Sequence, residues 1–226
     1  MSRLLASLCV LVALAAPAVA QVAPSPGDIA SYEAFHRAAH ENDAAAIRAL
    51  AGGGANLEAR DGNGRTPVHV AAFASADEAL AALAEIGADM NALEGGRYDA
   101  VTIAAVANDP ELMSVALAHG NRADNVTSVY DGTALIAAAH LGHAEVVRRL
   151  IDAGAPLDHI NNLGWTALIE AVILGDGGPD HLATAKALLE AGADASIPDR
   201  DGVTPLQHAE RQGYAAMANL FRAATR

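Results

Sequence analysis

Residues 61–72 read Asp-Gly-Asn-Gly-Arg-Thr-Pro-Val-His-Val-Ala-Ala, and this stretch decides how the rest of the chain is interpreted. Asp61 and Gly64 suit a tight turn. Thr66 suits a helix N-cap, and Pro67 suits the first helical position, where its missing N–H costs nothing. The Ala-Ala pair at 71–72 allows close packing of a short helix. The stretch therefore predicts a turn followed by a helix that begins at Pro67.

A fixed period repeats this pattern along the chain. Positions equivalent to Thr66 are separated by 33, 33, 34, 33 and 38 residues, and they are Glu33, Thr66, Asp99, Thr133, Thr166 and Thr204. A glycine suited to end the second helix of each unit follows the same steps, at Gly54, Gly87, Gly120, Gly154 and Gly192. Because two independent markers share one period and the same insertions, the chain is a tandem array.

The array resembles the ankyrin repeat family. The resemblance rests on the sequence Thr-Pro-Val-His at 66–69, the sequence Gly-Ala-Asp at 87–89 and 192–194, and the period near 33. The resemblance implies an all-α repeat solenoid of about six repeats, each a helix pair with a hairpin-like finger loop. Repeat three lacks the Thr-Pro word, and repeat five carries a five-residue insertion around 175–179. We expect these two repeats to be locally loose.

The first 20 residues are a different kind of sequence. Arg3 precedes an apolar run over 4–16, and Pro17 and the small triplet 18–20 follow. This order is typical of a secretory signal peptide, and the run is shorter than the ~20 residues that span a bilayer. We expect cleavage of the signal and no stable membrane insertion afterwards, with an uncleaved N-terminal anchor as the alternative.

These patterns divide the chain into three segments. The expected segments are a signal peptide over 1–20, an extended leader over 21–27 and the ankyrin repeat domain over 28–226. The expected repeats cover approximately residues 28–60, 61–93, 94–127, 128–160, 161–198 and 199–226.

Composition narrows the classes of partner and compartment. Cys9 is the only cysteine and lies in the expected signal peptide, so no thiol chemistry is expected in the mature protein. Removal of Arg3 leaves 13 basic against 27 acidic side chains, a net charge of −14. An acidic chain without a Lys/Arg cluster repels phosphate backbones, so no nucleic-acid partner is expected. High alanine and a single lysine are typical of a GC-rich bacterial genome, which favours the periplasm over the external medium.

No motif for catalysis or for a cofactor occurs in the chain. His36 and His40 stand four residues apart and could chelate zinc, but no convincing third ligand accompanies them. The glycines at 52–54 follow a helix, so they indicate a cap and not a phosphate site. The resemblance implies that His69 and His143 brace neighbouring loops by hydrogen bonds. We therefore expect a non-catalytic protein with no cofactor and no metal.

The resemblance also implies where a partner binds, because ankyrin arrays usually hold partners with their finger tips and with exposed positions of the inner helices, on the concave side. The candidate partner-binding residues at these positions are Arg65, Phe73, Tyr98, Val106, Tyr130, His140, Leu141, Trp165, Ile173 and Leu174. Three aromatic residues, Tyr32, Tyr98 and Trp165, share one finger position and are expected to be exposed anchors. The alternative is that the leader or the insertion near 175 folds over this apolar groove, or that its side chains pack together.

The sequence therefore predicts a monomeric, exported protein that binds an unidentified protein partner through an apolar concave groove and finger loops. Two alternatives stay open. One is an accessory or stress-protective factor for an envelope enzyme, because some exported bacterial ankyrin proteins that resemble this chain are linked to peroxide defence. The other is a secreted effector or a toxin-immunity protein.

Overall fold

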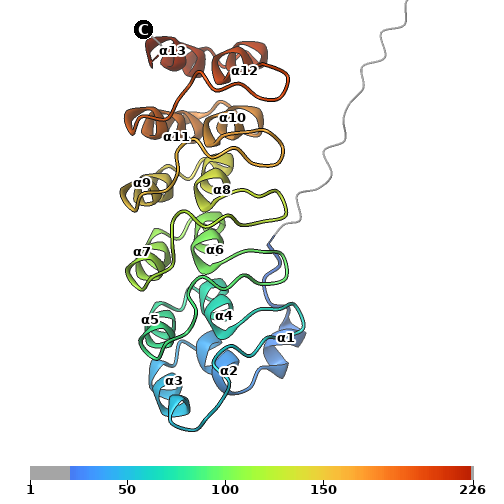
Figure 1. The fold of residues 1–226 in the computed structure, drawn as a ribbon, viewed down its shortest axis with the longest axis vertical. Coiled ribbons are helices and arrows are strands. Elements are labelled where there is room, and N and C mark those ends of the chain that lie inside the picture. Colours follow the sequence, from blue (N-terminus) through green and yellow to red (C-terminus); the bar gives the residue numbers. More distant parts are fainter. Residues whose placement is uncertain (1–20, 225–226) are drawn as a thin grey trace, which may run out of the picture.

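The repeat period builds two columns of helices, with finger loops projecting from one side (Figure 1). The structure is a computed structural model and describes residues 21–224, so the expected signal peptide lies outside the described residues. Inner and outer helices alternate along the chain after a short helix, α1 (Pro26–Ser31). The inner column contains α2 (Ala34–His40), α4 (Pro67–Phe73), α6 (Ala100–Ala107), α8 (Ala134–Leu141), α10 (Ala167–Ile173) and α12 (Pro205–Gln212). The outer column contains α3 (Ala44–Ala51), α5 (Asp77–Glu85), α7 (Pro110–Ala118), α9 (Ala144–Asp152), α11 (Pro179–Glu190) and α13 (Ala215–Ala224).

This arrangement confirms the predicted all-α repeat solenoid. Between residues 21 and 224 there is no β-strand, and the finger of repeat four carries one isolated antiparallel bridge, between Thr127 and Gly132. In the same part of the chain, no helix is both long and apolar enough to cross a membrane.

Small side chains hold the inner helices together. Alanines in the middle of the inner helices, including Ala71, Ala104 and Ala138, are completely buried. On the outer column, Val147 and Leu150 of α9 are also completely buried in the same continuous core. Because each repeat buries these faces only against its neighbours, the fold is stable as a stack and not as separate units.

Side-chain caps mark the start of the inner helices of repeats two to six, whereas Glu33 makes no capping hydrogen bond at the start of α2. Thr133 and Thr166 accept hydrogen bonds from the backbone N–H groups of Ile136 and Ile169, each at 3.3 Å. In repeat three Asp99 takes this role, because its Oδ1 accepts from the backbone N–H of Thr102 at 2.8 Å. The inner helix of repeat three is therefore capped, although this repeat lacks the Thr-Pro sequence.

The two irregular repeats are held by hydrogen bonds, which does not support the expectation that they are loose. In repeat three, Oδ2 of Asp99 accepts from the side-chain amides of Asn121 and Asn125, both at 2.9 Å. In repeat five, the insertion lies in the loop between α10 and α11, where the hydroxyl of Tyr214 donates to the carbonyl of Gly175 at 3.0 Å. Polar side chains thus compensate for the departures from the repeat pattern.

The leader is shorter than the expected residues 21–27. Helix α1 begins at Pro26 because Ser25 caps it, with the Ser25 hydroxyl accepting from the backbone N–H of Asp28 and the Asp28 carboxylate accepting from the backbone N–H of Ser25. The extended part therefore ends at Ser25, and α1 leads into the first repeat.

Adjacent fingers are joined tip to tip by backbone hydrogen bonds. Gly95 N–H donates to the carbonyl of Asn63 at 3.0 Å, Ser128 N–H to that of Arg97 at 2.8 Å, and Asn162 N–H to that of Tyr130 at 2.8 Å. The finger side of repeats two to five is therefore a connected surface.

His69 links a helix cap to the next finger, as expected for a framework residue. Its Nδ1 lies 3.1 Å from the backbone N and 2.8 Å from the hydroxyl of Thr66, and its Nε2 lies 3.0 Å from the carbonyl of Tyr98. The contacts require an Nε2–H tautomer, with Nδ1 accepting from Thr66. Burial lowers the pKa of His69, although the hydrogen bond to Tyr98 opposes this effect. His143 is also a framework residue, because its Nδ1 lies 2.9 Å from the carbonyl of Ala105.

A His69→Gln substitution is expected to make the protein less stable at neutral pH but less sensitive to acid. Gln207 caps α12 in the same way, accepting from the backbone N–H of Thr204 at 2.9 Å, so glutamine preserves the cap. The lost bond to Tyr98 is expected to cost about 1–3 kcal/mol. Since the folded pKa of His69 is lowered, the wild type loses stability as the pH falls below the unfolded value of 6.5.

Urea unfolding at pH 7.5, 6.5 and 5.5 measures both effects. The difference in free energy of unfolding between wild type and His69→Gln should shrink as the pH falls. His119, which is exposed in the turn after α7, provides the control, since His119→Gln should follow the wild-type pH dependence. Parallel pH dependence of His69→Gln and wild type would show that His69 does not contribute to acid sensitivity.

Candidate protein-binding surface

Exposed apolar side chains are concentrated in the fourth and fifth fingers and at the ends of the adjacent inner helices. Within residues 21–224, seven large hydrophobic residues are exposed, and six of them lie between residues 126 and 174. These six are Val126, Val129, Leu141, Ile160, Leu163 and Leu174, with exposed fractions from 38% to 51%. With the half-buried candidates Tyr130, His140, Trp165 and Ile173, they define the surface that we call the repeat-four/five surface.

Four of these residues were missed by the sequence reasoning. Val126 and Ile160 occupy the last position before the finger turn, and Val129 and Leu163 occupy the finger tip. Each pair is separated by 34 residues, which is the step between the terminal glycines Gly120 and Gly154. Extending the register to every finger position, and not only to the residue before the Thr-equivalent, would have found them.

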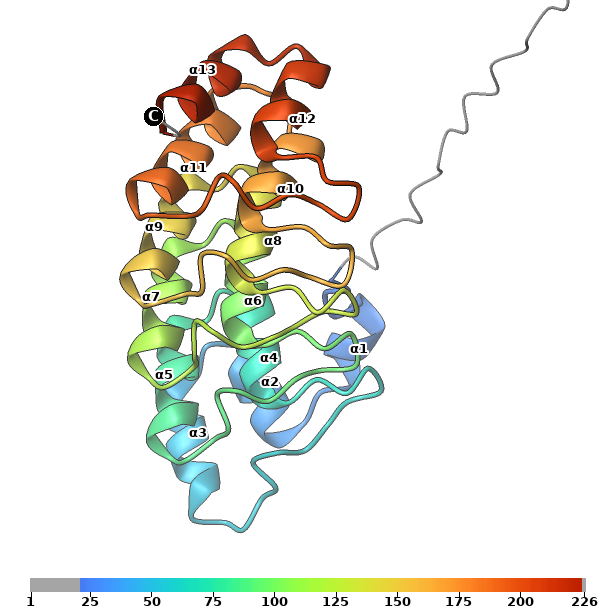
Figure 2. The same cartoon turned by 45° about the horizontal axis from the view of Figure 1, so that its top comes forward.

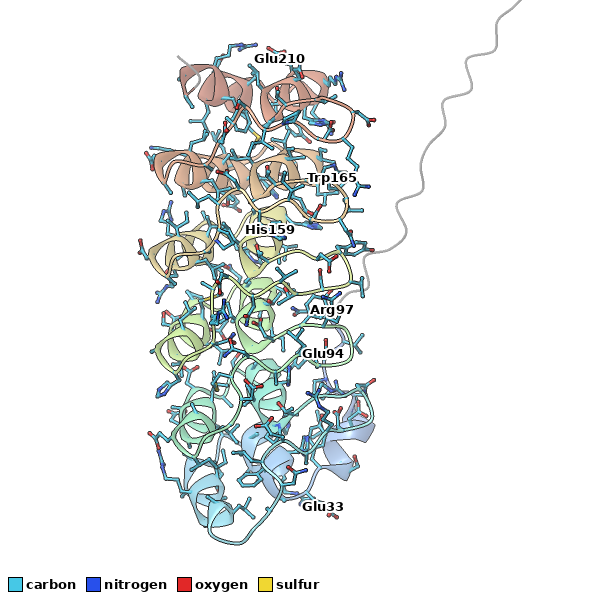
Figure 3. All side chains as sticks on the ribbon, viewed as in Figure 1. Glu33, Glu94, Arg97, His159, Trp165 and Glu210 are labelled. Carbon is cyan, nitrogen blue, oxygen red and sulfur yellow. The ribbon has the colours of Figure 1, made fainter. Side chains whose placement is uncertain are left out.

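A chain of polar contacts connects the inner helices to the fifth finger. Glu170 on α10 is 5% exposed, and its Oε1 accepts from the side-chain amide of Asn161 at 2.7 Å. Asn161 Oδ1 in turn accepts from the backbone N–H of Trp165 at 3.0 Å. On the other side, Oε2 of Glu170 lies 3.3 Å from Nδ1 of His140 on α8. These contacts hold the finger that carries Trp165, which Figure 3 labels, against α8 and α10.

The structure corrects the expectation that the three aromatic residues at one finger position are exposed anchors. Tyr32 is 4% exposed and Tyr98 is 9% exposed, and both belong to the hydrophobic core, while Trp165 at the same position is half-buried. Tyr32 turns inward because its hydroxyl donates to Oδ2 of Asp61 at 2.9 Å. These two tyrosines are therefore structural residues and not surface anchors.

Arg65 is also not a surface residue, contrary to its assignment as a contact residue. Its side chain has no exposed area, because it lies under the N-terminal segment and pairs with Asp61 and Asp28 at 2.7 and 2.9 Å. Phe73 and Val106 are half-buried at the ends of α4 and α6. Of the ten candidates, the two exposed ones, Leu141 and Leu174, lie in repeats four and five, while Phe73 and Val106 are half-buried like the other four candidates of those repeats.

Among the described residues, the histidine pair considered for zinc has no third ligand beside it. Within residues 21–224, no three His, Cys, Asp or Glu side chains are grouped so that they could hold a metal ion. His36, one of the two histidines considered for zinc, directs its Nε2 to the carbonyl of Arg65 at 3.0 Å. This is the role that His69 has in the next repeat.

Fold and surface together define a helical repeat solenoid whose accessible apolar side chains lie on finger loops and inner-helix ends. A family model described as ankyrin repeats (3 copies) matches residues 101–199. The chain belongs to the ankyrin repeat family, and the domain of this family is generally a non-catalytic protein–protein interaction module.

Solved structures and a curated relative support this membership. An ankyrin repeat domain from Acinetobacter baumannii AYE is 40% identical, with a TM-score of 0.79 over 84% of this chain and 97% of that chain. A second solved ankyrin repeat protein is 31% identical, with a TM-score of 0.77 over 85% of this chain and 98% of that chain. The ankyrin repeat protein YahD of Escherichia coli K12 is 36% identical over 101 residues, which are 44% of this chain and 50% of that protein. The match therefore spans half of YahD.

Two leucines of α8 test the division between core and surface. Leu135 is completely buried, whereas Leu141 is 40% exposed at the end of the same helix. Leu135→Ala is expected to lower the free energy of unfolding by about 2–5 kcal/mol, because it leaves a cavity between repeats. Leu141→Ala is expected to change it by about 0.5 kcal/mol or less. Urea unfolding followed by circular dichroism measures both, and equal losses would show that Leu141 belongs to the core.

Proposed function

We propose that this protein binds a protein partner through the repeat-four/five surface, as a monomer, in the bacterial cell envelope. The supporting observation is the concentration of six exposed large apolar side chains between residues 126 and 174. Exposed apolar side chains gathered in one region of a soluble fold favour an interaction site.

The polar groups near this surface are already paired within the chain. Arg97 pairs with Asp131 at 3.1 Å, and Glu170 is held by Asn161. The apolar side chains therefore dominate what is offered to a partner. Tyr130 and Trp165 add half-buried aromatic rings, the residue type most often found among the strongest contacts of interfaces.

The fingers also require little ordering when a partner binds. The hydrogen bond between Asn162 N–H and the carbonyl of Tyr130 joins the fourth and fifth finger tips, and the Asn162 side-chain amide donates to the carbonyl of Val129 at 2.9 Å. A surface that is ordered before binding loses less conformational entropy in the complex. Partner binding through these two fingers is therefore compatible with a small contact area.

Photo-crosslinking from single positions tests the proposed surface. A photoreactive residue at Leu141 or Leu174 is expected to crosslink to a partner in cells, because both side chains are about 40% exposed on this surface. The matched control is Lys186, an exposed residue of outer helix α11. Crosslinks that are as abundant from position 186 as from 141 and 174 would contradict the assignment.

A second measurement uses the partner identified in this way. The double substitution Leu141→Ala and Leu174→Ala is expected to weaken binding at least about tenfold, since truncating a few central side chains removes most of the affinity of an interface. Trp165 is the only tryptophan, so its fluorescence should change when the partner is added. Unchanged affinity in the folded variant would exclude this surface.

The proposal of an envelope location rests on residues 1–20, whose basic, apolar and small-residue regions follow the order of a signal peptide. N-terminal sequencing of protein recovered from the periplasm is expected to begin at Gln21. Recovery of the intact N-terminus from a membrane fraction would instead support a retained anchor.

A further inference from the structure

The segment of residues 21–31 lies on the finger side of the first three repeats. Figures 1 and 2 both show α1 beside the inner helices α2 and α4, on the side from which the fingers project. At its start, the side-chain amide of Gln21 donates to the carbonyl of Thr102 on α6 at 3.0 Å. The segment therefore contacts the side of the array on which the family binds partners.

Arg65 is the main attachment of this segment. Its Nη1 donates to the carbonyl of Val22 at 3.0 Å, and its Nη2 donates to Oδ2 of Asp28 at 2.9 Å. Its Nε donates to Oδ2 of Asp61, on its own finger, at 2.7 Å. Two of the three partners of this fully buried guanidinium therefore come from the N-terminal segment.

The rest of the segment is weakly attached. Helix α1 has six residues, none of which is buried, and an isolated helix of this length is not stable in water. Val22 is 64% exposed, and Ile29 is the one residue of the segment that packs, partly buried, against the core. The attachment thus depends on the charge-assisted hydrogen bonds of Arg65 and not on apolar burial.

The chemistry of Arg65 defines what could replace the segment. If residues 21–31 leave, Asp61 still balances one charge, while Nη1 and Nη2 lose their protein acceptors and are uncovered. A carboxylate forms stronger, charge-assisted hydrogen bonds with a guanidinium than water does, so a segment that brings a carboxylate and a carbonyl can take the place of residues 21–31. An acidic peptide segment provides both groups.

We propose that residues 21–31 are a displaceable intramolecular ligand of the first three repeats, and that the site they leave receives an acidic peptide segment whose carboxylate pairs with Nη2 of Arg65. This site is separate from the repeat-four/five surface and does not depend on it. While the segment is bound, the first site is closed and the second remains open.

A synthetic peptide with the sequence of residues 21–32, carrying a fluorescent label, tests this proposal on the full chain. The wild type should bind it weakly, because the tethered segment competes at a high effective concentration. Asp28→Asn keeps a side chain that can cap α1 but removes the charge opposite Arg65. This variant is expected to bind the peptide at least about tenfold more tightly than the wild type. The same peptide with asparagine at position 28 should bind the Asp28→Asn variant no more tightly than it binds the wild type.

Asp124→Asn provides the matched control, because Asp124 also pairs with an arginine, Arg122 at 2.8 Å, but at an exposed position near the end of repeat three. It should bind the peptide no better than the wild type. Equal peptide binding by wild type, Asp28→Asn and Asp124→Asn would overturn the proposal.

Hydrogen exchange separates a displaceable segment from a permanent part of the core. In Asp28→Asn the amides of Ile29 and Tyr32, which are bonded within the segment, should lose protection, and peptide addition should not restore it. The amides of Val70 in α4 and of Ala74 at its C-cap should stay protected. Loss of protection in α4 together with the segment would show that residues 21–31 are structural and would overturn the proposal. Neither result depends on the Leu141 and Leu174 measurements.

Discussion

The burial of small inner-helix side chains between successive repeats is the constraint on which the rest of the structure depends. Ala71, Ala104 and Ala138 have no exposed area, and their size allows neighbouring inner helices to approach closely. This approach places each finger near the next one, so that tips can pair by backbone hydrogen bonds and His69 can reach the carbonyl of Tyr98. The binding surface follows from this spacing, because it consists of positions that the stack leaves uncovered.

The finger side has two halves with different physical character. In the first half a buried charge, Arg65, is satisfied by an acidic residue of the N-terminal segment. In the second half, polar side chains pair among themselves and leave apolar groups such as Leu141 and Leu174 accessible. One half is therefore suited to charge-assisted recognition and the other to apolar contact. A single array could in this way recognise two different partner segments.

Much of the architecture could be predicted because repeat markers act locally. A threonine cap, a proline at the first helical position and a terminal glycine each have the same effect wherever they recur, so the period predicted the helix pairs, while the framework role of His69 was implied by the family resemblance. The exposure of finger residues could not be predicted in this way. Tyr32 and Tyr98 share a repeat position with Trp165 but are buried, since their surroundings depend on adjacent repeats and not on their own.

The sequence by itself determined the fold class, the helix starts and the acidic, cysteine-poor character of the repeat domain, because these depend on local propensity and composition. Only the tertiary structure decided which finger residues are accessible. It brought Asp28 to Arg65 across 37 positions, and it placed Asn121 and Asn125 around Oδ2 of Asp99, where they support the irregular repeat three. Contacts of this kind join residues that no repeat register relates, so they arise only when the stacked array brings distant segments together.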